Sequence, residues 1–241
     1  MVPGQVPRLP TEATPGQGDQ PRAPPPRARK RGLYFRRVQR KLLSQDPRRR
    51  AILARLRLLW QRLPRAGVLV FFDVKPVAVK AYGGRRYTSA RRLVLARAQK
   101  TRGFFYLFLL YEVNSGRVHW AFLNGKASGQ VCQFMRRVRR WYPGQPVWVA
   151  LDQDGAHPRK SRQTRRAMRG LGLHWISLPK GSPDDNPVET LNSDIEQAIL
   201  ENSNDPDARA TQQRISAHLR GRNRRADRHI QIPYLGDSHK H

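Results

Sequence analysis

The chain has 241 residues, with 47 Lys and Arg against 17 Asp and Glu, and a formal net charge of +30 at pH 7. So much charge of one sign repels itself unless a polyanion binds, which argues against an acidic or neutral metabolic enzyme and favours a nucleic-acid partner. The longest uninterrupted apolar run is Phe104–Tyr111, whereas a membrane-spanning helix needs roughly 20 apolar residues. No signal peptide is visible. The single cysteine, Cys132, excludes a disulfide framework and fits a reducing compartment such as the cytoplasm.

The first part of the chain divides into a tail and a helix. Residues 1–33 hold 8 of the 19 prolines and few large apolar side chains. They cannot bury enough surface to offset chain entropy, so we predict a disordered basic tail. Residues 34–65 are predicted to be a helical linker, because Asp46 and Pro47 suit a helix start and apolar residues then recur on one face. These apolar residues are Ile52, Leu56, Leu59 and Leu63.

Residues 66–220 carry the pattern of one α/β domain. Apolar, aromatic and β-branched runs predict strands over 66–74, 103–113, 118–123, 147–151 and 174–178. Helical patterns cover 129–142, 162–171, 187–200 and 208–219. Strands joined by short turns pair antiparallel, and strands separated by helices can lie parallel. We therefore predict a ribonuclease-H-like mixed five-stranded sheet flanked by helices, followed by a basic C-terminal tail over 221–241.

Acidic residues are rare in the predicted domain, and their positions are therefore informative. Residues 66–183 contain only Asp73, Glu112, Asp152 and Asp154. Asp73 comes at the end of the first predicted strand and Asp152 at the end of the fourth, and open α/β sheets bind ligands outside the carboxyl ends of their strands. Two carboxylates there repel each other unless a cation lies between them. Oxygen ligands of this kind suit Mg²⁺ or Mn²⁺.

A third carboxylate, Glu189, follows the last predicted strand and would complete the set that a pair of phosphoryl-transfer metal ions requires. Each of the three acids also has a structural interpretation. Asn186, Pro187 and Glu189 match a capping box, in which the glutamate stabilises a helix start. Asp152 could begin an Asx-turn, and Asp73 could pair with an arginine. In either interpretation Asn186 and Pro187 would support the turn before the helix.

Two segments around these acids resemble the DDE transposases of bacterial insertion sequences, in the branch related to mariner-like elements. The segment LDQDGAHP contains Asp152 and His157, and LPKGSPDDNPVE contains Glu189 in a Pro-x-x-Ser-Pro-x-x-Asn-Pro-x-Glu pattern. Between Asp152 and Glu189 lie 36 residues, which is close to the spacing of that branch. The resemblance covers residues 45–220, which correspond to the catalytic domain of the family.

The resemblance implies an enzyme that cleaves DNA at the ends of an insertion element and transfers the strands to target DNA. Asp73, Asp152 and Glu189 would be the catalytic residues and would hold two Mg²⁺ or Mn²⁺ ions. One ion would activate water and later the 3′-hydroxyl, and the other would stabilise the leaving 3′ oxygen. The partner would be double-stranded DNA of the terminal repeats and the target, bound by a homodimer. Such a protein is expected in the bacterial cytoplasm, associated with the nucleoid and not with a membrane.

Basic and polar residues near the acids are candidates for DNA contacts. Contacts to phosphates do not depend on base sequence, and they weaken as the salt concentration rises. His157 would either contact the scissile strand or orient Asp152. Lys180 would either contact phosphate or point into solvent. The remaining candidates follow Asp152 closely: Arg159, Lys160, Arg162, Arg165 and Arg166.

The sequence departs from the family pattern at three places. Val74 and Gln153 stand where the family often has Glu and Asn. Residues 34–65 are too short for the two helix-turn-helix modules of full-length relatives, so we expect a truncated or mis-started N-terminus. Two alternative functions remain open: a truncated or decayed copy that only binds DNA through its charge, and a ribonuclease or junction resolvase with the same fold.

Overall fold

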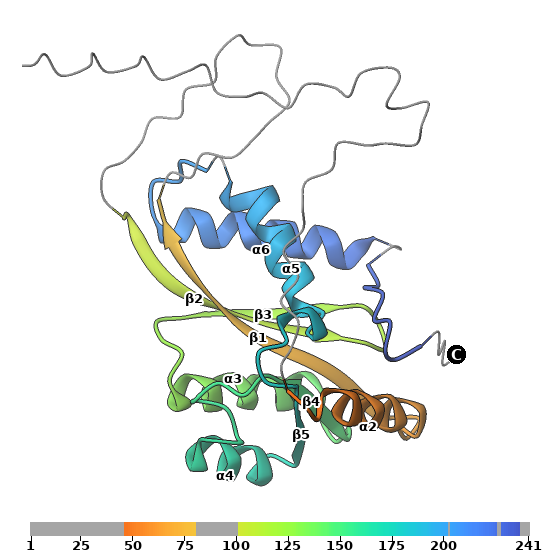
Figure 1. The fold of residues 1–241 in the computed structure, drawn as a ribbon. Coiled ribbons are helices and arrows are strands. Elements are labelled where there is room, and N and C mark those ends of the chain that lie inside the picture. Colours follow the sequence, from red (N-terminus) through yellow and green to blue (C-terminus); the bar gives the residue numbers. More distant parts are fainter. Residues whose placement is uncertain (1–45, 81–100, 202, 226–227, 237–241) are drawn as a thin grey trace, which may run out of the picture. The chain divides into compact units, whose positions relative to one another are not determined.

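Five strands form one mixed sheet in the order β3-β2-β1-β4-β5 (Figure 1). The structure, a computed structural model, describes residues 46–80, 101–201, 203–225 and 228–236. The strands are β1 (Val68–Val79), β2 (Gly103–Glu112), β3 (Val118–Leu123), β4 (Val147–Leu151) and β5 (Leu173–Ser177). The central strand β1 pairs antiparallel with β2 and parallel with β4. It therefore joins an antiparallel half of the sheet to a parallel half, as predicted.

Within the described residues, helices cover both faces of this sheet. They are α2 (Arg49–Gln61), α3 (Ser128–Trp141), α4 (Arg162–Gly170), α5 (Val188–Ile195) and α6 (Ala208–Arg224), with a 3-10 turn η1 (Pro183–Asp185) and a π-helical segment η2 (Glu196–Leu200). The predicted tail 1–33, residues 34–45 of the predicted linker and residues 237–241 of the predicted C-terminal tail lie outside the described residues. In the parts of the chain that the structure describes, no helix is both long enough and apolar enough to cross a membrane.

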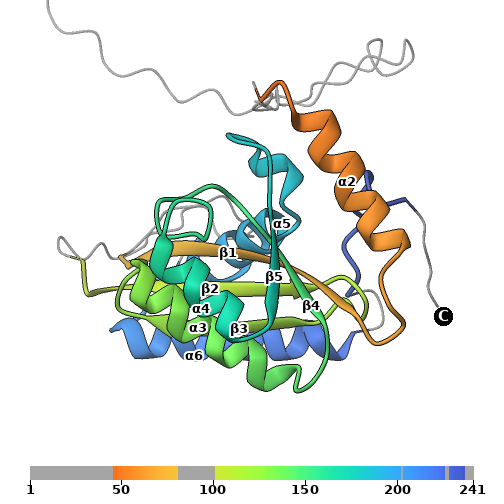
Figure 2. The same cartoon turned by 90° about the horizontal axis from the view of Figure 1, so that it is seen from below.

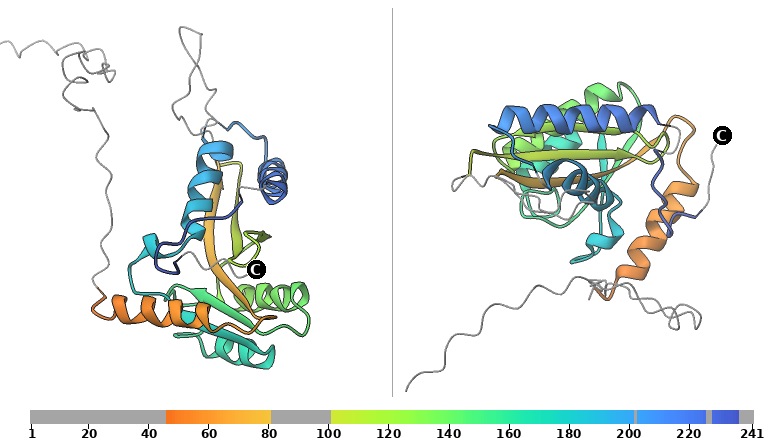
Figure 3. Two further views of the ribbon diagram at one scale, coloured as in Figure 1. Left: turned by 90° about the vertical axis from the view of Figure 1, so that its right-hand side faces the viewer. Right: turned by 90° about the horizontal axis from the view of Figure 1, so that it is seen from above.

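The side chains of the sheet build two apolar layers, one on each face. Leu69 and Phe71 of β1 belong to the layer that α2, α5 and α6 cover, whereas Val70 and Phe72 belong to the layer that α3 and α4 cover. Successive side chains of a strand point to opposite faces, so the sequence of β1 itself dictates this division. Helices α3 and α4 lie side by side in both orientations (Figures 1 and 2). In the left panel of Figure 3, α2 lies at the lower end of the sheet and α6 near the upper end.

Strand β1 is longer than the predicted strand 66–74, which changes the place of Asp73. Pairing with β4 ends at Phe72, but pairing with β2 continues to Val79. Pro76 lies in this continuation, where β1 has β2 as its only partner among the described strands, and prolines are tolerated in such edge segments but not in central strands. The prediction that Asp73 ends the first strand is therefore wrong. Asp73 lies inside β1, at the point where β4 separates from it.

The other predicted elements agree with the structure to within a few residues. The predicted helix 187–200 consists of α5 followed by the wider turns of η2. The predicted strand 174–178 begins and ends one residue earlier, and the predicted helix 208–219 continues to Arg224. None of these differences moves a candidate site residue onto another element.

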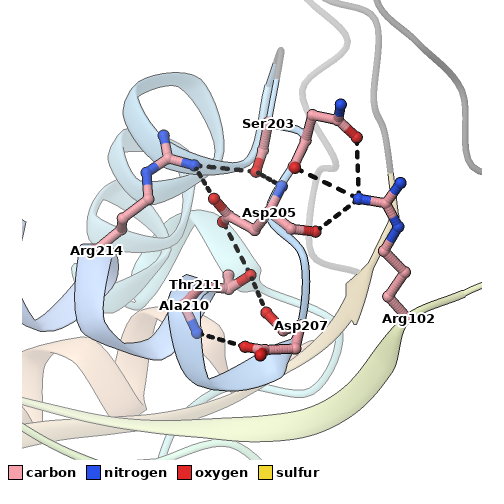
Figure 4. Close-up of polar contacts among 8 residues, drawn as sticks. Arg102, Ser203, Asp205, Asp207, Ala210, Thr211 and Arg214 are labelled. Atoms are coloured by element: carbon pink, nitrogen blue, oxygen red, sulfur yellow. Dashed lines mark hydrogen bonds and ion pairs between the residues drawn. The ribbon is translucent and has the colours of Figure 1, made fainter.

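A polar network attaches the loop before α6 to the start of β2 (Figure 4). The carboxylate of Asp205 accepts hydrogen bonds from Arg214 at 2.8 Å and Thr211 at 2.9 Å. Its backbone oxygen accepts a bond from Arg102 Nη1 at 3.0 Å. Asp207 caps α6 by accepting a bond from a backbone N–H at 2.8 Å. These contacts fix where α6 begins and so how it crosses the sheet.

The edge strand β3 is partnered by a side chain of α6. Asn223 accepts a hydrogen bond from the N–H of Val118 at 2.9 Å and donates one to its carbonyl oxygen at 2.8 Å. One amide thus satisfies both backbone groups that a neighbouring strand would otherwise bind, which protects the start of an exposed edge.

We expect Asn223→Ala to lower the free energy of unfolding by about 1–2 kcal/mol, because both backbone groups of Val118 lose their partner. The control Gln213→Ala alters an exposed residue of the same helix and should change that free energy by less than about 0.5 kcal/mol. Urea denaturation measures both. Equal free energies of unfolding for the two variants would contradict this role of Asn223.

Candidate active site

Strand register brings the first two carboxylates together. Parallel pairing of β1 with β4 ends at the pair Phe72 and Leu151, so the next residues, Asp73 and Asp152, emerge side by side. Both side chains of the last pair belong to the layer of α3 and α4. By the alternation of a strand, Asp73 and Asp152 point to the opposite face, which α5 covers.

The third carboxylate reaches the same place from α5. Glu189 is the second residue of that helix, and it lines a cavity of about 940 Å³ together with Asp73 and Asp152. The structure thus brings the three predicted catalytic acids to one cavity from three separate segments of the chain.

The turn before α5 is held by Asn186, as predicted for a supporting residue. Its Oδ1 accepts a hydrogen bond from the N–H of Val188 at 3.2 Å, and its Nδ2 donates one to the carbonyl oxygen of Phe72 at 3.3 Å. Pro187 is buried at the position that caps the helix. The N–H of Asn186 donates to Pro183 at 2.8 Å and not to the carboxylate of Glu189. The bond from the Asn186 N–H to the Glu189 carboxylate that would complete a capping box is therefore missing. The Glu189 carboxylate instead accepts a bond from Asn192.

Asn192 is a site residue that the sequence prediction missed. Its Nδ2 donates hydrogen bonds to Asp73 Oδ2 at 2.7 Å and to Glu189 Oε2 at 3.2 Å. It stands three residues after Glu189, a spacing that places two side chains on the same face of a helix. From this spacing the sequence could have placed Asn192 beside Glu189. It does not show that Asp73 also lies against this face of α5.

The electrostatic setting of Asp73 is unfavourable for a negative charge. Burial and the nearby charge of Glu189 raise the pKa of Asp73 from 3.8 to about 6, with a smaller contribution from Asp152. The hydrogen bond from Asn192 acts in the opposite direction. The hydrogen-bond partners of Asp73 are thus the N–H of Val74 and the amide of Asn192, and not the arginine considered as an alternative.

His157 is turned towards Asp152. It is 4% exposed, and its Nδ1 contacts the Asp152 carboxylate and lies 3.1 Å from the Asp152 carbonyl oxygen. Burial lowers the pKa of His157, but the hydrogen bond and charge of Asp152 outweigh it and raise the pKa overall. Its ring also packs against Phe72 at 5.5 Å between centroids. Of the two roles considered for His157, this burial supports orientation of Asp152 and does not support direct contact with DNA.

The residues after Asp152 form a tight turn. Asp152 Oδ1 accepts a bond from the N–H of Asp154 at 3.2 Å, so the predicted Asx-turn is present, and the Asp152 side chain still remains half-exposed. Asp154 pairs with Lys126 at 3.3 Å. Gln153 donates to the carbonyl oxygen of Leu178 at 2.8 Å and so ties the end of β4 to the segment after β5.

Of the six basic residues predicted to contact DNA, three lie outside the lining of the cavity and three belong to it. Arg165 donates to the backbone oxygens of Pro158 and Arg159 at 2.9 Å and so braces the turn. Arg162 and Arg166 are exposed on α4, outside the lining of the cavity. The other three line the cavity beside the acids: Arg159, Lys160 and Lys180.

The start of α2 closes one side of the cavity. Asp46 accepts hydrogen bonds at 3.0 Å from the N–H of Lys180 and from its own helix start. Arg49 binds both carboxylate oxygens of the buried Asp185, at 2.8 Å through Nε and at 2.6 Å through Nη2. These contacts fasten the helix to the segment that leads into Glu189. The sequence predicted Asp46 as the N-cap of this helix, but the N-cap is Arg48, two residues later. The link from Asp46 to Lys180 was not predicted.

The donor chemistry of the site fits a hard divalent cation. Asp73, Asp152 and Glu189 offer only oxygen atoms, which Mg²⁺ and Mn²⁺ prefer. The pKa of Asp73 is raised first by burial and then by the charge of Glu189, and a cation would offset both effects. Among the described residues, no three acidic, histidine or cysteine side chains already converge as a metal-binding group. The acids share a cavity, and a bound ion would have to draw them closer.

A family model for DDE superfamily endonucleases matches residues 68–212. The chain belongs to this family. The matched region contains all three acids, and the predicted membership of the DDE endonucleases is confirmed. No curated protein matches the sequence of the chain.

Solved structures of the Mos1 mariner transposase share the fold. The Mos1 strand transfer complex has a TM-score of 0.61 at 15% identity, over 80% of this chain and 60% of that one. The Mos1 paired-end complex with Mg gives 0.61 at 16% identity, over 87% and 65%. The Mos1 catalytic domain gives 0.54 at 14% identity, over 76% and 85%. The predicted ribonuclease-H-like fold class is confirmed, and the chain spans about 60% of the length of the Mos1 chains in the larger complexes.

We expect Asp73→Asn to stabilise the metal-free protein at pH 7 by about 1–3 kcal/mol, because a rise of the pKa to about 6 penalises the ionised folded state. A carboxyl group with a raised pKa contributes stability below about pH 4 and loses it as the pH rises through 6. The two proteins should therefore unfold alike at pH 3.5 and differ at pH 7. Urea denaturation with a chelator measures this, and a variant less stable than the parent at pH 7 would overturn the expectation.

Proposed function

We propose that the chain cleaves DNA strands at the ends of a mobile element and joins them to target DNA, in a reaction that needs Mg²⁺ or Mn²⁺. The observation that carries this proposal is the meeting of Asp73, Asp152 and Glu189 at one cavity that basic side chains also line. Membership of the DDE endonucleases and the fold shared with the Mos1 catalytic domain support the same class of reaction.

The proposed catalytic roles follow from the contacts of each side chain. Asp73, Asp152 and Glu189 would hold two divalent ions, which when bound would activate the attacking hydroxyl and stabilise the leaving 3′ oxygen. His157 would keep the Asp152 carboxylate in place through its Nδ1 contact. Asn186 would hold the start of α5, and with it Glu189, against β1. The protein's share of catalysis would be positioning and charge neutralisation, as in other phosphoryl transfers.

The proposed partner is double-stranded DNA, as element end and as target. The net charge of +30 supplies long-range attraction, and Arg159, Lys160 and Lys180 place cationic side chains beside the acids. The similar Mos1 structures are a strand transfer complex and paired-end complexes. By analogy we propose that two copies of this chain act together on paired DNA ends, in the cytoplasm at the nucleoid.

We expect Asp152→Asn and Glu189→Gln each to reduce Mg²⁺-dependent cleavage by about 100-fold or more, because a metal ion contributes several kcal/mol of transition-state stabilisation. The substrate is a plasmid carrying the DNA that flanks the gene on both sides, and nicking is followed on a gel. DNA affinity in a chelator should change little in either variant.

The matched control is Asp194→Asn, another acid of α5, which pairs with His218 at 2.8 Å outside the cavity lining. It should cleave at the parental rate. Undiminished cleavage by Asp152→Asn would overturn the proposal. A parent protein that binds DNA but nicks it with neither Mg²⁺ nor Mn²⁺ would favour the alternative of a decayed binding protein, and preferential cleavage of RNA–DNA hybrids or four-way junctions would favour the other alternative.

We expect the double variant Arg159→Ala/Lys160→Ala to lower the slope of log affinity against log salt by about 2, since each lost phosphate contact lowers it by about 1. The control Arg136→Ala/Arg140→Ala removes two exposed arginines of α3, away from the cavity, and should retain the parental slope. Fluorescence anisotropy with a labelled duplex over a range of salt concentrations measures both. Equal slopes for the two double variants would exclude Arg159 and Lys160 as phosphate contacts.

A further inference from the structure

The side chain of Asn192 lies between two of the three acids. It is 4% exposed and projects from α5 one turn after Glu189. A single nitrogen, Nδ2, donates to Asp73 Oδ2 at 2.7 Å and to Glu189 Oε2 at 3.2 Å. An amide nitrogen carries two N–H groups, so one group can serve each carboxylate.

These two bonds act on groups that repel each other. Asp73 and Glu189 each accept a bond from the same nitrogen, so their two carboxylates lie close together. Hydrogen bonds to ionised acceptors are shorter and stronger than neutral ones. Asn192 therefore offsets part of the repulsion between two neighbouring carboxylates.

The same bonds fix the direction of each carboxylate. The terminal torsions of Asp and Glu side chains have broad minima, so an unbonded carboxylate rotates readily. Asn192 binds one oxygen of each group, Oδ2 of Asp73 and Oε2 of Glu189. The second oxygen of each group is then held in a defined direction, and the N–H of Val74 also bonds the Asp73 carboxylate.

The Asn192 amide is oriented so that its nitrogen is hydrogen-bonded and its oxygen is not. Its Oδ1 is buried and has no hydrogen-bond partner among the described residues. Leaving a buried acceptor unpaired costs about 1–3 kcal/mol, and buried polar atoms of this kind are uncommon in native proteins. A side chain kept for stability alone would satisfy both ends, so the arrangement indicates a requirement for the two donors.

We propose that Asn192 is a positioning residue that presets the directions of the Asp73 and Glu189 carboxylates for divalent cation binding. This inference rests on the proposed function, in which both acids are metal ligands. Groups that orient metal ligands typically contribute 10–100-fold to metal affinity. Asn192 contributes through ligand direction, without binding the ion itself.

The test is Mn²⁺ affinity of the whole chain without DNA, measured by electron paramagnetic resonance of the free ion. Asn192→Leu keeps a similar volume and removes both donors, and its dissociation constant for Mn²⁺ should rise by about 10-fold or more. Asn192→Ser retains one donor and should give an intermediate value. The control Ser193→Leu alters the exposed neighbour on the same helix and should match the parent. At saturating Mn²⁺, cleavage by Asn192→Leu should recover towards the parental rate, which a purely structural defect would not allow.

The outcomes separate the two proposals. Undiminished Mn²⁺ affinity in both Asn192 variants overturns the positioning role and leaves the metal site standing. A parent protein whose Mn²⁺ binding is absent, or is unaffected by Asp73→Asn, overturns the metal site itself and with it the role of Asn192. If Asn192→Leu does not fold, the Ser variant decides, because a parental affinity in that variant contradicts the proposal.

Discussion

The short parallel pairing between β1 and β4 is the constraint on which the candidate site depends. It spans five residue pairs, from Val68 with Val147 to Phe72 with Leu151, and it ends one residue before two aspartates. A slip of one residue in this register would turn one of them to the opposite face of the sheet. The apolar residues of β1 and β4 fix the register because their alternation must match both helical layers at once. The placement of two acids is therefore a by-product of core packing.

The three acids of the candidate site lie in a strongly basic protein. Lys and Arg outnumber Asp and Glu by 47 to 17. Asp73 and Glu189 nevertheless accept hydrogen bonds from the amide of Asn192, and Asp152 contacts His157 and a backbone N–H. Nearby basic residues pair elsewhere, as Arg49 does with Asp185 and Lys126 with Asp154. The overall charge thus says little about the candidate site, whereas the positions of the few acids define it.

Much of the fold and the three acids could be predicted from sequence because they depend on local pattern. Apolar runs and turn residues located the five strands, and the scarcity of acids drew attention to Asp73 and Asp152. The prediction of β1 stopped with the apolar run at residue 74, whereas the strand continues through Pro76 as a segment that pairs with β2 and no longer with β4. Asn192 and the Arg49–Asp185 pair were missed because each joins segments more than 100 residues apart. The burial of His157 was equally invisible, since it depends on how the turn folds back onto Phe72.

The contacts of α2 and of the C-terminal segment show which parts of the chain support the candidate site. The family model starts at residue 68 and stops at 212, but the wall of the cavity starts at Asp46. Tyr234 donates a hydrogen bond to the carbonyl oxygen of Asp185 at 2.6 Å, and Leu56 and Leu235 are buried in the same apolar layer. A fragment trimmed to the matched region would keep every strand and all three acids, yet it would lose both braces of the turn that carries Glu189. The smallest unit able to hold its own active site together is therefore longer, at both ends, than the region by which its family is recognised.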